Sequence, residues 1–467
     1  MRGADPSDTF SMSDVLCIGF DEPGQKRVKT ACEFLLVKEA FFKTSEEIFE
    51  SETPMQPRCV VISAVKATKK EDIAGEVQVV RQFFPETFIV LVVEKKIKLE
   101  DAKFIKKSGC NYVVFESDFL NSTRFEYVLL QVVSAAYLPV KVADFQPNTT
   151  VDFHVYTIMP LNQKILPVIQ PGTLMNEARL KKMASVDELY VKRNQIHLYN
   201  EYLVKHPDMS AKGLSNRCRA QFQSVSLAHS NLIFLLTDQA EAGSYDQGKV
   251  LLQNCQTLST NLLETISMLP DPWSIINQST FGMIGGTDRS MMVAAMAAVA
   301  SFATELGSSD DVMLAGLFCD LALLELSPKS LGKLDSIEGR LQMSEEDIAI
   351  FRNHPATSLN RLLESKMLVS DSVKNIILAT HEQADEKGFP QKTLAVRIPV
   401  ESALILFHEM VDLEFRFKLG KERESYQTIR QRVFDREAEL VAKGQGRFNA
   451  ILIEKLRSMI DEQKAAG

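Results

Sequence analysis

The spacing of apolar residues changes along the chain, and this change restricts the fold more than any other feature of the sequence. In the first part, short apolar runs alternate with longer amphipathic stretches, which predicts a parallel sheet covered by helices. From residue 201 onward, apolar residues recur at helical spacing, which predicts helices and no strand. The chain has 467 residues, so we expect a multidomain protein.

The first predicted domain covers residues 14–138 and has an α/β fold. Its predicted strands are Val15–Phe20, Cys59–Ala64, Phe88–Val93 and Tyr112–Phe115. Helices are predicted over Lys70–Phe84 and Leu99–Ser108, and Gly109 stands where it would end the second of them. A doubly covered parallel sheet of the flavodoxin-like type follows from this order.

The second and third predicted domains are a small α+β module at 140–199 and a helical connector at 201–270. The module is predicted to contain a hairpin, a turn, a short helix and a strand, at Phe153–Ile158 with Lys164–Val168, Pro171-Gly172-Thr173, Asn176–Ala184 and Glu188–Val191. The connector helices are Gln221–Asp238 and Gln247–Leu269, and Pro270-Asp271-Pro272 marks the start of an all-α domain at 271–467.

Composition restricts the class of protein. Hydrophobic residues make up 45% of the chain and charged residues 24%, which is typical of a folded protein. The net charge of −8 argues against nucleic-acid binding. Met1–Asp14 has no signal-peptide pattern, and the apolar run Met291–Ala303 is too short to cross a bilayer and predicts a buried helix instead. The seven scattered cysteines indicate a reduced, cytoplasmic protein without membrane insertion.

Four short segments of the last domain carry histidines and carboxylates. They are Cys319-Asp320 on a predicted apolar helix Leu314–Leu324, His354-Pro355, His381 to Pro390, and His408-Glu409. Such side chains, brought together from separate helices, suit Fe, Mn or Zn. A helical bundle can hold two such ions in its core and use them on a phosphodiester.

These segments resemble, in order and local sequence, the HD-GYP family of bacterial cyclic-di-GMP phosphodiesterases. The resemblance runs from about Ser290 to Phe448 and is most specific at the family pattern HHExxDGxGYP, which His381, Glu382, Asp385, Gly388 and Pro390 match, with Phe389 in place of Tyr. It implies a helical HD-type bundle and a substrate-binding loop at Asp385, Gly388, Phe389 and Pro390.

Several positions depart from the family pattern. Cys319, Thr380 and Arg289 stand where the family has histidine, Leu323 replaces a phosphate-steadying Lys, and Glu409 replaces a metal-bridging Asp. The remaining candidate ligands are Asp320, His354, His381 and Glu409, which suit at most one Fe, Mn or Zn ion. Cys319 lies in an apolar run, which predicts a raised pKa for its thiol and an unreactive side chain.

Each candidate also has a purely structural interpretation. Asp320 inside an apolar helix could pair with Arg289, since buried carboxylates are seldom unpaired. His354 before Pro355 could close one helix and cap the next. His408-Glu409 could be an exposed pair on an amphipathic helix.

The first domain resembles a response-regulator receiver domain. Asp21-Glu22 would be its acidic pair, but Ser63 stands in place of the phosphorylated Asp, Val92 or Val93 in place of the switch Thr/Ser, and Phe115 or Glu116 in place of the Lys. The resemblance therefore implies a receiver-like domain without phosphoryl transfer. The module at 140–199 is similar to small domains that precede HD-GYP units.

The leading hypothesis is a cytoplasmic bacterial signalling protein with a catalytically impaired HD-GYP-type domain. It would act through contacts with signalling proteins, with cyclic-di-GMP as a candidate ligand, and as a homodimer through its connector helices. One alternative is an active metal-dependent cyclic-di-GMP phosphodiesterase with an unusual ligand set. The other is a helical interaction domain that binds neither nucleotide nor metal.

Overall fold

A computed structural model describes residues 14–50, 57–67, 69–94, 97–134, 136–158, 165–184, 189–241, 245–269, 272–273, 289–334, 336–417 and 424–466. The chain forms two compact units, residues 1–136 with 233–244, and residues 137–232 with 245–467. The predictions for Met1–Asp14, apart from Asp14 itself, and for Pro270 and Asp271 fall outside the described residues.

The first unit contains a five-stranded parallel sheet in the order β2-β1-β3-β4-β5. Its strands are β1 Val15–Ile18, β2 Glu39–Phe42, β3 Cys59–Ser63, β4 Phe88–Val93 and β5 Tyr112–Phe115. The central strands are buried because helices cover both faces. Four strand predictions are confirmed within two residues, whereas β2 was missed. This edge strand is only half buried, so it lacks the continuous apolar run that marks its neighbours.

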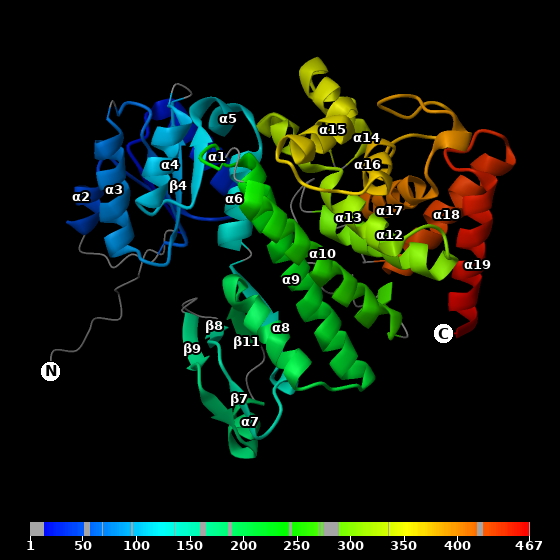
Figure 1. The fold of residues 1–467 in the computed structure, drawn as a ribbon, viewed down its shortest axis with the longest axis horizontal. Coiled ribbons are helices and arrows are strands. Elements are labelled where there is room, and N and C mark those ends of the chain that lie inside the picture. The colour runs from blue at the N-terminus through cyan, green and yellow to red at the C-terminus, as the bar shows by residue number, and fades with distance from the viewer. Residues whose placement is uncertain are drawn as a thin grey trace. The chain divides into compact units, whose positions relative to one another are not determined.

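The helices of the first unit alternate with its strands (Figure 1). They are α1 Glu22–Leu35, α2 Ser45–Phe49, α3 Lys70–Phe83, α4 Leu99–Lys107, α5 Glu116–Asn121 and α6 Arg124–Leu129. Helix α1 packs with α6, and α3 packs with α4. Buried Arg27 of α1 holds the first of these pairs together through an ion pair with Glu126 of α6.

Asp21 and Glu22 follow β1 at the carboxyl edge of this sheet. The Asp21 side chain caps α1 by accepting a hydrogen bond from the Gly24 amide at 3.1 Å. Ser63 ends β3 and Phe115 ends β5, at the positions that the sequence comparison assigned to them. A hydroxyl at residue 63 cannot form an acyl phosphate.

The second unit begins with two small antiparallel sheets, of order β6-β11-β8-β9 and β10-β7. Their strands are β6 Tyr137–Val140, β7 Thr149–Val151, β8 Val155–Ile158, β9 Ile165–Ile169, β10 Thr173–Met175 and β11 Leu189–Lys192. The predicted hairpin is the β8–β9 pair. The predicted short helix is α7 Glu177–Met183, whose N-cap residue Asn176 accepts a hydrogen bond from the Arg179 amide.

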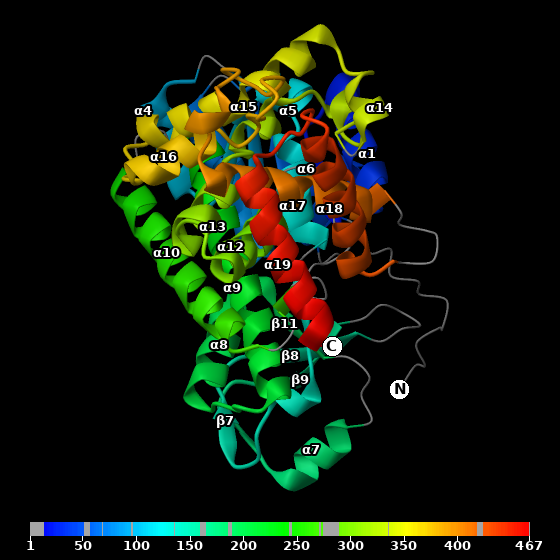
Figure 2. The same ribbon diagram turned by 90° about the vertical axis from the view of Figure 1, so that its right-hand side faces the viewer.

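After β11, the described part of the chain contains helices, turns and loops and no strand, as predicted, and residues 233–237 at the end of one helix belong to the first unit. The helices are α8 Ile196–Lys205, α9 Ala211–Thr237, α10 Tyr245–Ser267, α12 Ser290–Thr304, α13 Ser309–Phe318, α14 Ile337–Arg340, α15 Glu345–Glu364, α16 Asp371–Leu378, α17 Val400–Phe417, α18 Tyr426–Ala442 and α19 Ala450–Ala466. Helix α12 packs against α13, α17 and α19 (Figure 2). It is buried on nearly every side, as its apolar sequence predicts.

Small residues allow α12 and α13 to approach each other closely. A Cβ atom at Gly316 of α13 would lie 2.8 Å from the Cβ and 2.9 Å from the Cα of Ala294 on α12. A side chain at this position would therefore force the two helix backbones apart.

Gly316→Ala should consequently destabilise this unit by about 1–3 kcal/mol, although alanine is intrinsically the better helix former. Gly75→Ala is the matched control, since a Cβ added at Gly75 of α3 would meet no other part of the chain within 4 Å. The control should be neutral or stabilising by up to about 1 kcal/mol. Calorimetric unfolding of the two variants measures the difference, and equal melting temperatures would contradict the close-packing argument.

All seven cysteines are free and buried. Among the described residues, no helix has the length and apolar character needed to cross a membrane.

Candidate metal centre

His354 lies inside helix α15, one residue before Pro355. Because proline has no amide hydrogen, the carbonyl of Phe351, four residues earlier, loses its helical partner. The Nδ1 atom of His354 lies 2.5 Å from that carbonyl oxygen. A carbonyl oxygen only accepts, so Nδ1 carries a proton, and Nε2 faces the centre. The expectation that His354 closes a helix is wrong, because α15 continues for ten residues beyond it.

His381 follows the C-terminal end of α16 and is held by the loop after it. The ring of Phe389 stacks on the His381 ring, with centroids 4.7 Å apart and planes at 15°. The Phe389 amide donates to the His381 carbonyl at 3.1 Å. A Cβ at Gly388 would lie 2.5 Å from the same carbonyl oxygen, so only glycine permits this close approach.

Two of the candidate substrate-binding residues, Gly388 and Phe389, therefore lie against His381. Phe389 precedes Pro390 through a cis peptide bond. Asp385 accepts a hydrogen bond from the Lys387 amide within the loop. Both carboxylate oxygens of Glu382 accept backbone amides, from Gln391 at 2.6 Å and Thr393 at 2.7 Å. In this conformation, the loop fixes the position of the His381 ring.

Asp320 lies between α13 and a 3-10 helix, Leu321–Glu325. The prediction of one apolar helix through this residue is wrong, since the helical turn tightens directly after Asp320. The break turns the carboxylate toward His354, whose Nε2 lies 3.3 Å from Oδ1 of Asp320. Ser290 is a second contact at 3.5 Å. Arg289, the alternative partner of Asp320, forms its ion pair with Asp412, and its charge also lowers the pKa of Asp320.

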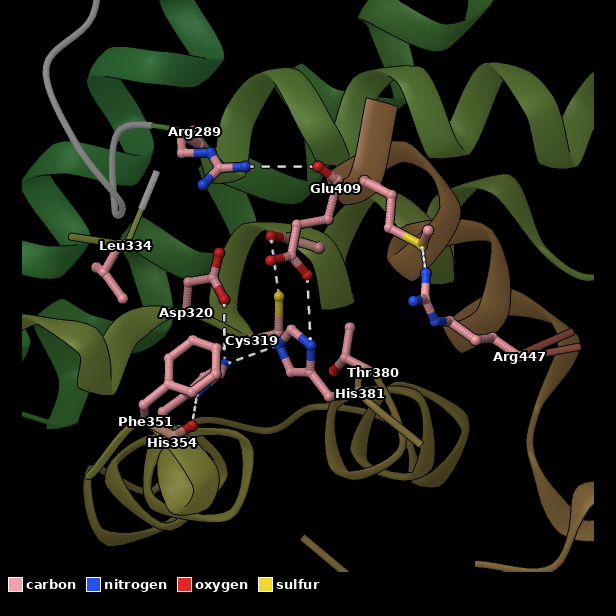
Figure 3. A network of polar contacts seen from close by, with 12 residues as sticks. Arg289, Cys319, Asp320, Leu334, Phe351, His354, Thr380, His381, Glu409 and Arg447 are labelled. Atoms are coloured by element: carbon pink, nitrogen blue, oxygen red, sulfur yellow. Dashed lines mark hydrogen bonds and ion pairs between the residues drawn. The ribbon is translucent and has the colours of Figure 1, made fainter. Parts of the chain in front are cut away.

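Three of the four candidate ligands converge, as Figure 3 shows. Ligand atoms of Asp320, His354 and His381 all lie within 4.8 Å of one another. The Nε2 atoms of His354 and His381 are 3.0 Å apart. Ligand atoms at about 2.1 Å from a tetrahedral ion are about 3.4 Å apart, so this spacing suits one metal ion.

Glu409 lies on the opposite side of the His381 ring. Its Oε2 is 3.3 Å from Nδ1 of His381, and this charge contact favours a proton on Nδ1, which leaves Nε2 to face the centre. Carboxylates orient metal-binding histidines in this way in many proteins. The structure thus places Glu409 as the residue that orients His381, outside the group of three ligands.

The protonation states also suit a cation. Burial lowers the pKa of His381 to about 4, so its imidazole is neutral at pH 7. Burial raises the pKa of Asp320, but its hydrogen bond and charge interaction with His354 outweigh this effect and lower the pKa overall. Two imidazole nitrogens and a carboxylate oxygen therefore converge on the same point, an arrangement that a bound cation would stabilise.

Positions 319 and 380, where the family pattern has histidine, carry other residues here, and their side chains contact backbone carbonyls. The Cys319 thiol contacts the Gly316 carbonyl, and burial raises its pKa well above the usual range, as predicted. The Thr380 hydroxyl donates to the Ile377 carbonyl of its own helix. Neither side chain belongs to the three-residue ligand group.

Two arginines occupy the other side of the centre. Nε of Arg289 lies 2.6 Å from Oδ2 of Asp412, and both side chains are almost fully buried. Nη2 of Arg340 lies 3.1 Å from Oε1 of Glu409. Arg289 was recognisable in the sequence, whereas Arg340 was missed because no motif marks the loop that carries it.

His408 points away from this centre. It is fully buried, and its ring lies nearly parallel to Trp273 at 5.6 Å between centroids. Nδ1 of His408 is 2.9 Å from the Tyr426 hydroxyl. The expectation of an exposed His408-Glu409 pair on an amphipathic helix is wrong, because α17 is covered on both of these sides.

A cavity with a volume of about 10 Å³ lies between the residues of the centre. This is roughly the space of one water molecule or one ion. It is lined by Arg289, Asp320, Leu323, Leu334, Arg340, Phe351, His354, His381 and Glu409.

Comparison with known proteins identifies the helical region. Residues 272–431 match the protein-family model described as HD domain, so this part of the chain contains an HD domain. The comparison with curated proteins finds no match. Among solved structures, the chain is similar to Bd1817, an HDG"Y"P protein from Bdellovibrio bacteriovorus, with 17% identity and a TM-score of 0.40 over 70% of this chain and 99% of that one.

Proposed function

We propose that the HD domain is a degenerate HD-GYP-type domain that holds a single divalent ion on Asp320, His354 and His381. The observation that carries this proposal is the approach of the two Nε2 atoms to 3.0 Å, with Nδ1 of His354 against a carbonyl and Nδ1 of His381 facing a carboxylate. A bound Fe, Mn or Zn ion would polarise a phosphoryl oxygen at this point.

The domain is proposed to be catalytically impaired, because its residues leave no place for a second ion. Arg289 and Arg340 supply two fixed positive charges beside the single ligand group. They would repel a second cation in a poorly hydrated centre. A two-metal displacement on a phosphodiester therefore lacks its second ion. We infer a role in signalling, in which cyclic-di-GMP is bound without being cleaved.

We further propose a flavodoxin-like, receiver-like domain at 14–138 that does not undergo phosphorylation. The strand order β2-β1-β3-β4-β5 supports it, since flavodoxin-like sheets share this order. Ser63 at the end of β3 supports the loss of phosphoryl transfer. The proposed domain organisation also includes the small module at 140–199 and the helical connector at 201–270. We propose that the protein is a cytoplasmic homodimer and that its partners are signalling proteins.

An active one-metal phosphodiesterase is the second candidate. It is favoured by the number of ligands, because three protein ligands leave one position of a tetrahedral ion open for water. In this candidate, the open position would face the cavity and supply the nucleophile.

Metal analysis of anaerobically purified protein tests the proposal. We expect about one Fe, Mn or Zn ion per chain, as three ligands around one point imply, and no turnover of cyclic-di-GMP or pGpG in Mn²⁺ or Fe²⁺ buffers. One ion together with turnover that Asp320→Ala abolishes would establish the second candidate instead. About two ions per chain would contradict the ligand assignment, and no metal would leave a helical interaction domain.

A further inference from the structure

We propose that Arg340 binds a phosphate group at the mouth of the cavity, beside the ion held by Asp320, His354 and His381. This inference rests on the proposed function and deepens it. It assigns the phosphate of a phosphoester as the ligand chemistry of the centre, and Arg340 as the residue that recognises it. The sequence pattern gave no indication of this residue.

Arg340 ends the short helix α14 and points its guanidinium into the centre. Its Nε donates to the Leu334 carbonyl at 3.0 Å, and its Nη2 donates to Glu409 at 3.1 Å. The guanidinium carbon lies 4.8 Å from the centroid of the Phe351 ring. Nη1 makes no hydrogen bond to any residue that the structure describes, so one edge of the guanidinium is available to a ligand.

The loop that carries Arg340 is held firmly in place. Gly339 allows a close backbone approach, since a Cβ there would lie 2.5 Å from the Lys333 carbonyl oxygen. Asp347 ties the two ends of the loop together by accepting hydrogen bonds from serine side chains at Ser327, Ser330 and Ser344. A guanidinium that is fixed before binding loses little entropy when a ligand arrives.

Leu323 is uncharged, so the positive charge of the cavity has to come from another residue. It stands where the resembled family has a phosphate-steadying Lys, and it packs in a small apolar cluster with Leu326, Leu334 and Met343. Two members of this cluster, Leu334 and Met343, flank Arg340 in the sequence. The apolar residue at 323 thus helps to seat the loop, and Arg340 supplies a positive charge in the same cavity.

Charge favours an anionic ligand at this place. The four ionised residues lining the cavity are Arg289, Arg340, Asp320 and Glu409, and their formal charges cancel. Arg289 is paired with Asp412 and Arg340 with Glu409, so a divalent ion bound beside Asp320 would leave a net positive charge, which a phosphate anion would neutralise. Guanidinium groups match phosphate oxygens with two parallel hydrogen bonds.

Arg340 is suited to this role and Arg289 is not. Arg289 is 4% exposed and hydrogen-bonded to Asp412, whereas 23% of the Arg340 side chain is exposed. The cavity has room for about one ion or water. The phosphate would therefore bind on the outer side, where Arg340 is accessible.

Titration of inorganic phosphate into the Mn²⁺-loaded full chain, followed by calorimetry, tests the assignment. Arg340→Gln should weaken phosphate binding by at least about tenfold, as expected for loss of a charge-assisted hydrogen bond. The phosphate affinity of Arg340→Lys should lie between those of the unmodified chain and of Arg340→Gln, since lysine keeps the charge but not the planar geometry. Arg352→Gln is the matched control, because Arg352 is an exposed residue of α15 and its loss changes the net charge equally.

The metal titration of each variant is measured separately. If Mn²⁺ binds normally and Arg340→Gln binds phosphate as tightly as the unmodified chain, the inference is overturned and the proposed metal centre stands. If the unmodified chain takes up no Mn²⁺, the proposed function fails, and phosphate is titrated into the metal-free protein. If the metal-free chain binds phosphate and Arg340→Gln abolishes that binding, the assignment of Arg340 is supported without the metal. If the metal-free chain binds no phosphate, the assignment is overturned.

Discussion

His381→Ala should remove nearly all metal from the purified protein. Its Nε2 is one of three converging ligand atoms, and two ligands alone hold a divalent ion poorly. We expect the dissociation constant for Mn²⁺ to rise by at least about a hundredfold, since removing even an orienting partner costs 10–100-fold. Calorimetric titration with Mn²⁺ and elemental analysis measure the effect.

Two further variants make this prediction specific. Glu409→Gln should weaken Mn²⁺ binding by about 10–100-fold, because Glu409 orients His381 without belonging to the ligand group. Thr380→Ala is the neighbouring control and should leave the affinity unchanged, since its hydroxyl bonds within its own helix. The melting temperatures of metal-free His381→Ala and of the metal-free unmodified chain are compared as a test of folding. If they are equal and His381→Ala retains its metal, the ion lies elsewhere.

Arg289→Ala should destabilise the HD domain by about 3 kcal/mol or more. Asp412 has only 2% of its side chain exposed, and the variant removes a 2.6 Å hydrogen bond to its carboxylate. A carboxylate that loses its charged partner inside a protein keeps its desolvation cost. Urea unfolding followed by Trp273 fluorescence reports this region, because Trp273 is the only tryptophan and is buried in the same unit.

The matched control is Arg432→Ala. Arg432 pairs with Glu424 at 2.9 Å, but both side chains are at least 33% exposed, so its loss should cost under about 1 kcal/mol. The double variant Arg289→Met with Asp412→Leu should recover most of the stability, since apolar residues often replace buried ion pairs without loss. Equal unfolding midpoints for Arg289→Ala and Arg432→Ala would contradict the importance of this buried pair.

The architecture of both units could be predicted wherever one periodicity dominates a segment. The apolar runs of β3 and β4 have no competing pattern, so these strands were placed to within one residue. Edge strand β2 was missed because exposure on one side removes the apolar run. The helix break at Asp320 was missed because a turn that tightens inside an apolar segment leaves the composition unchanged.

By itself, the sequence determined the identities of the three converging residues and the loss of the others. Asp320, His354 and His381 stand in recognisable local patterns, and Pro355 already implies a free carbonyl four residues before it. Only the tertiary structure decided what surrounds them. Arg340 and Glu409 are separated by 69 residues in sequence, and Arg289 and Asp412 by 123. Such pairings depend on helix packing, because hydrogen bonds act over about 3 Å and local sequence does not specify distances between distant segments.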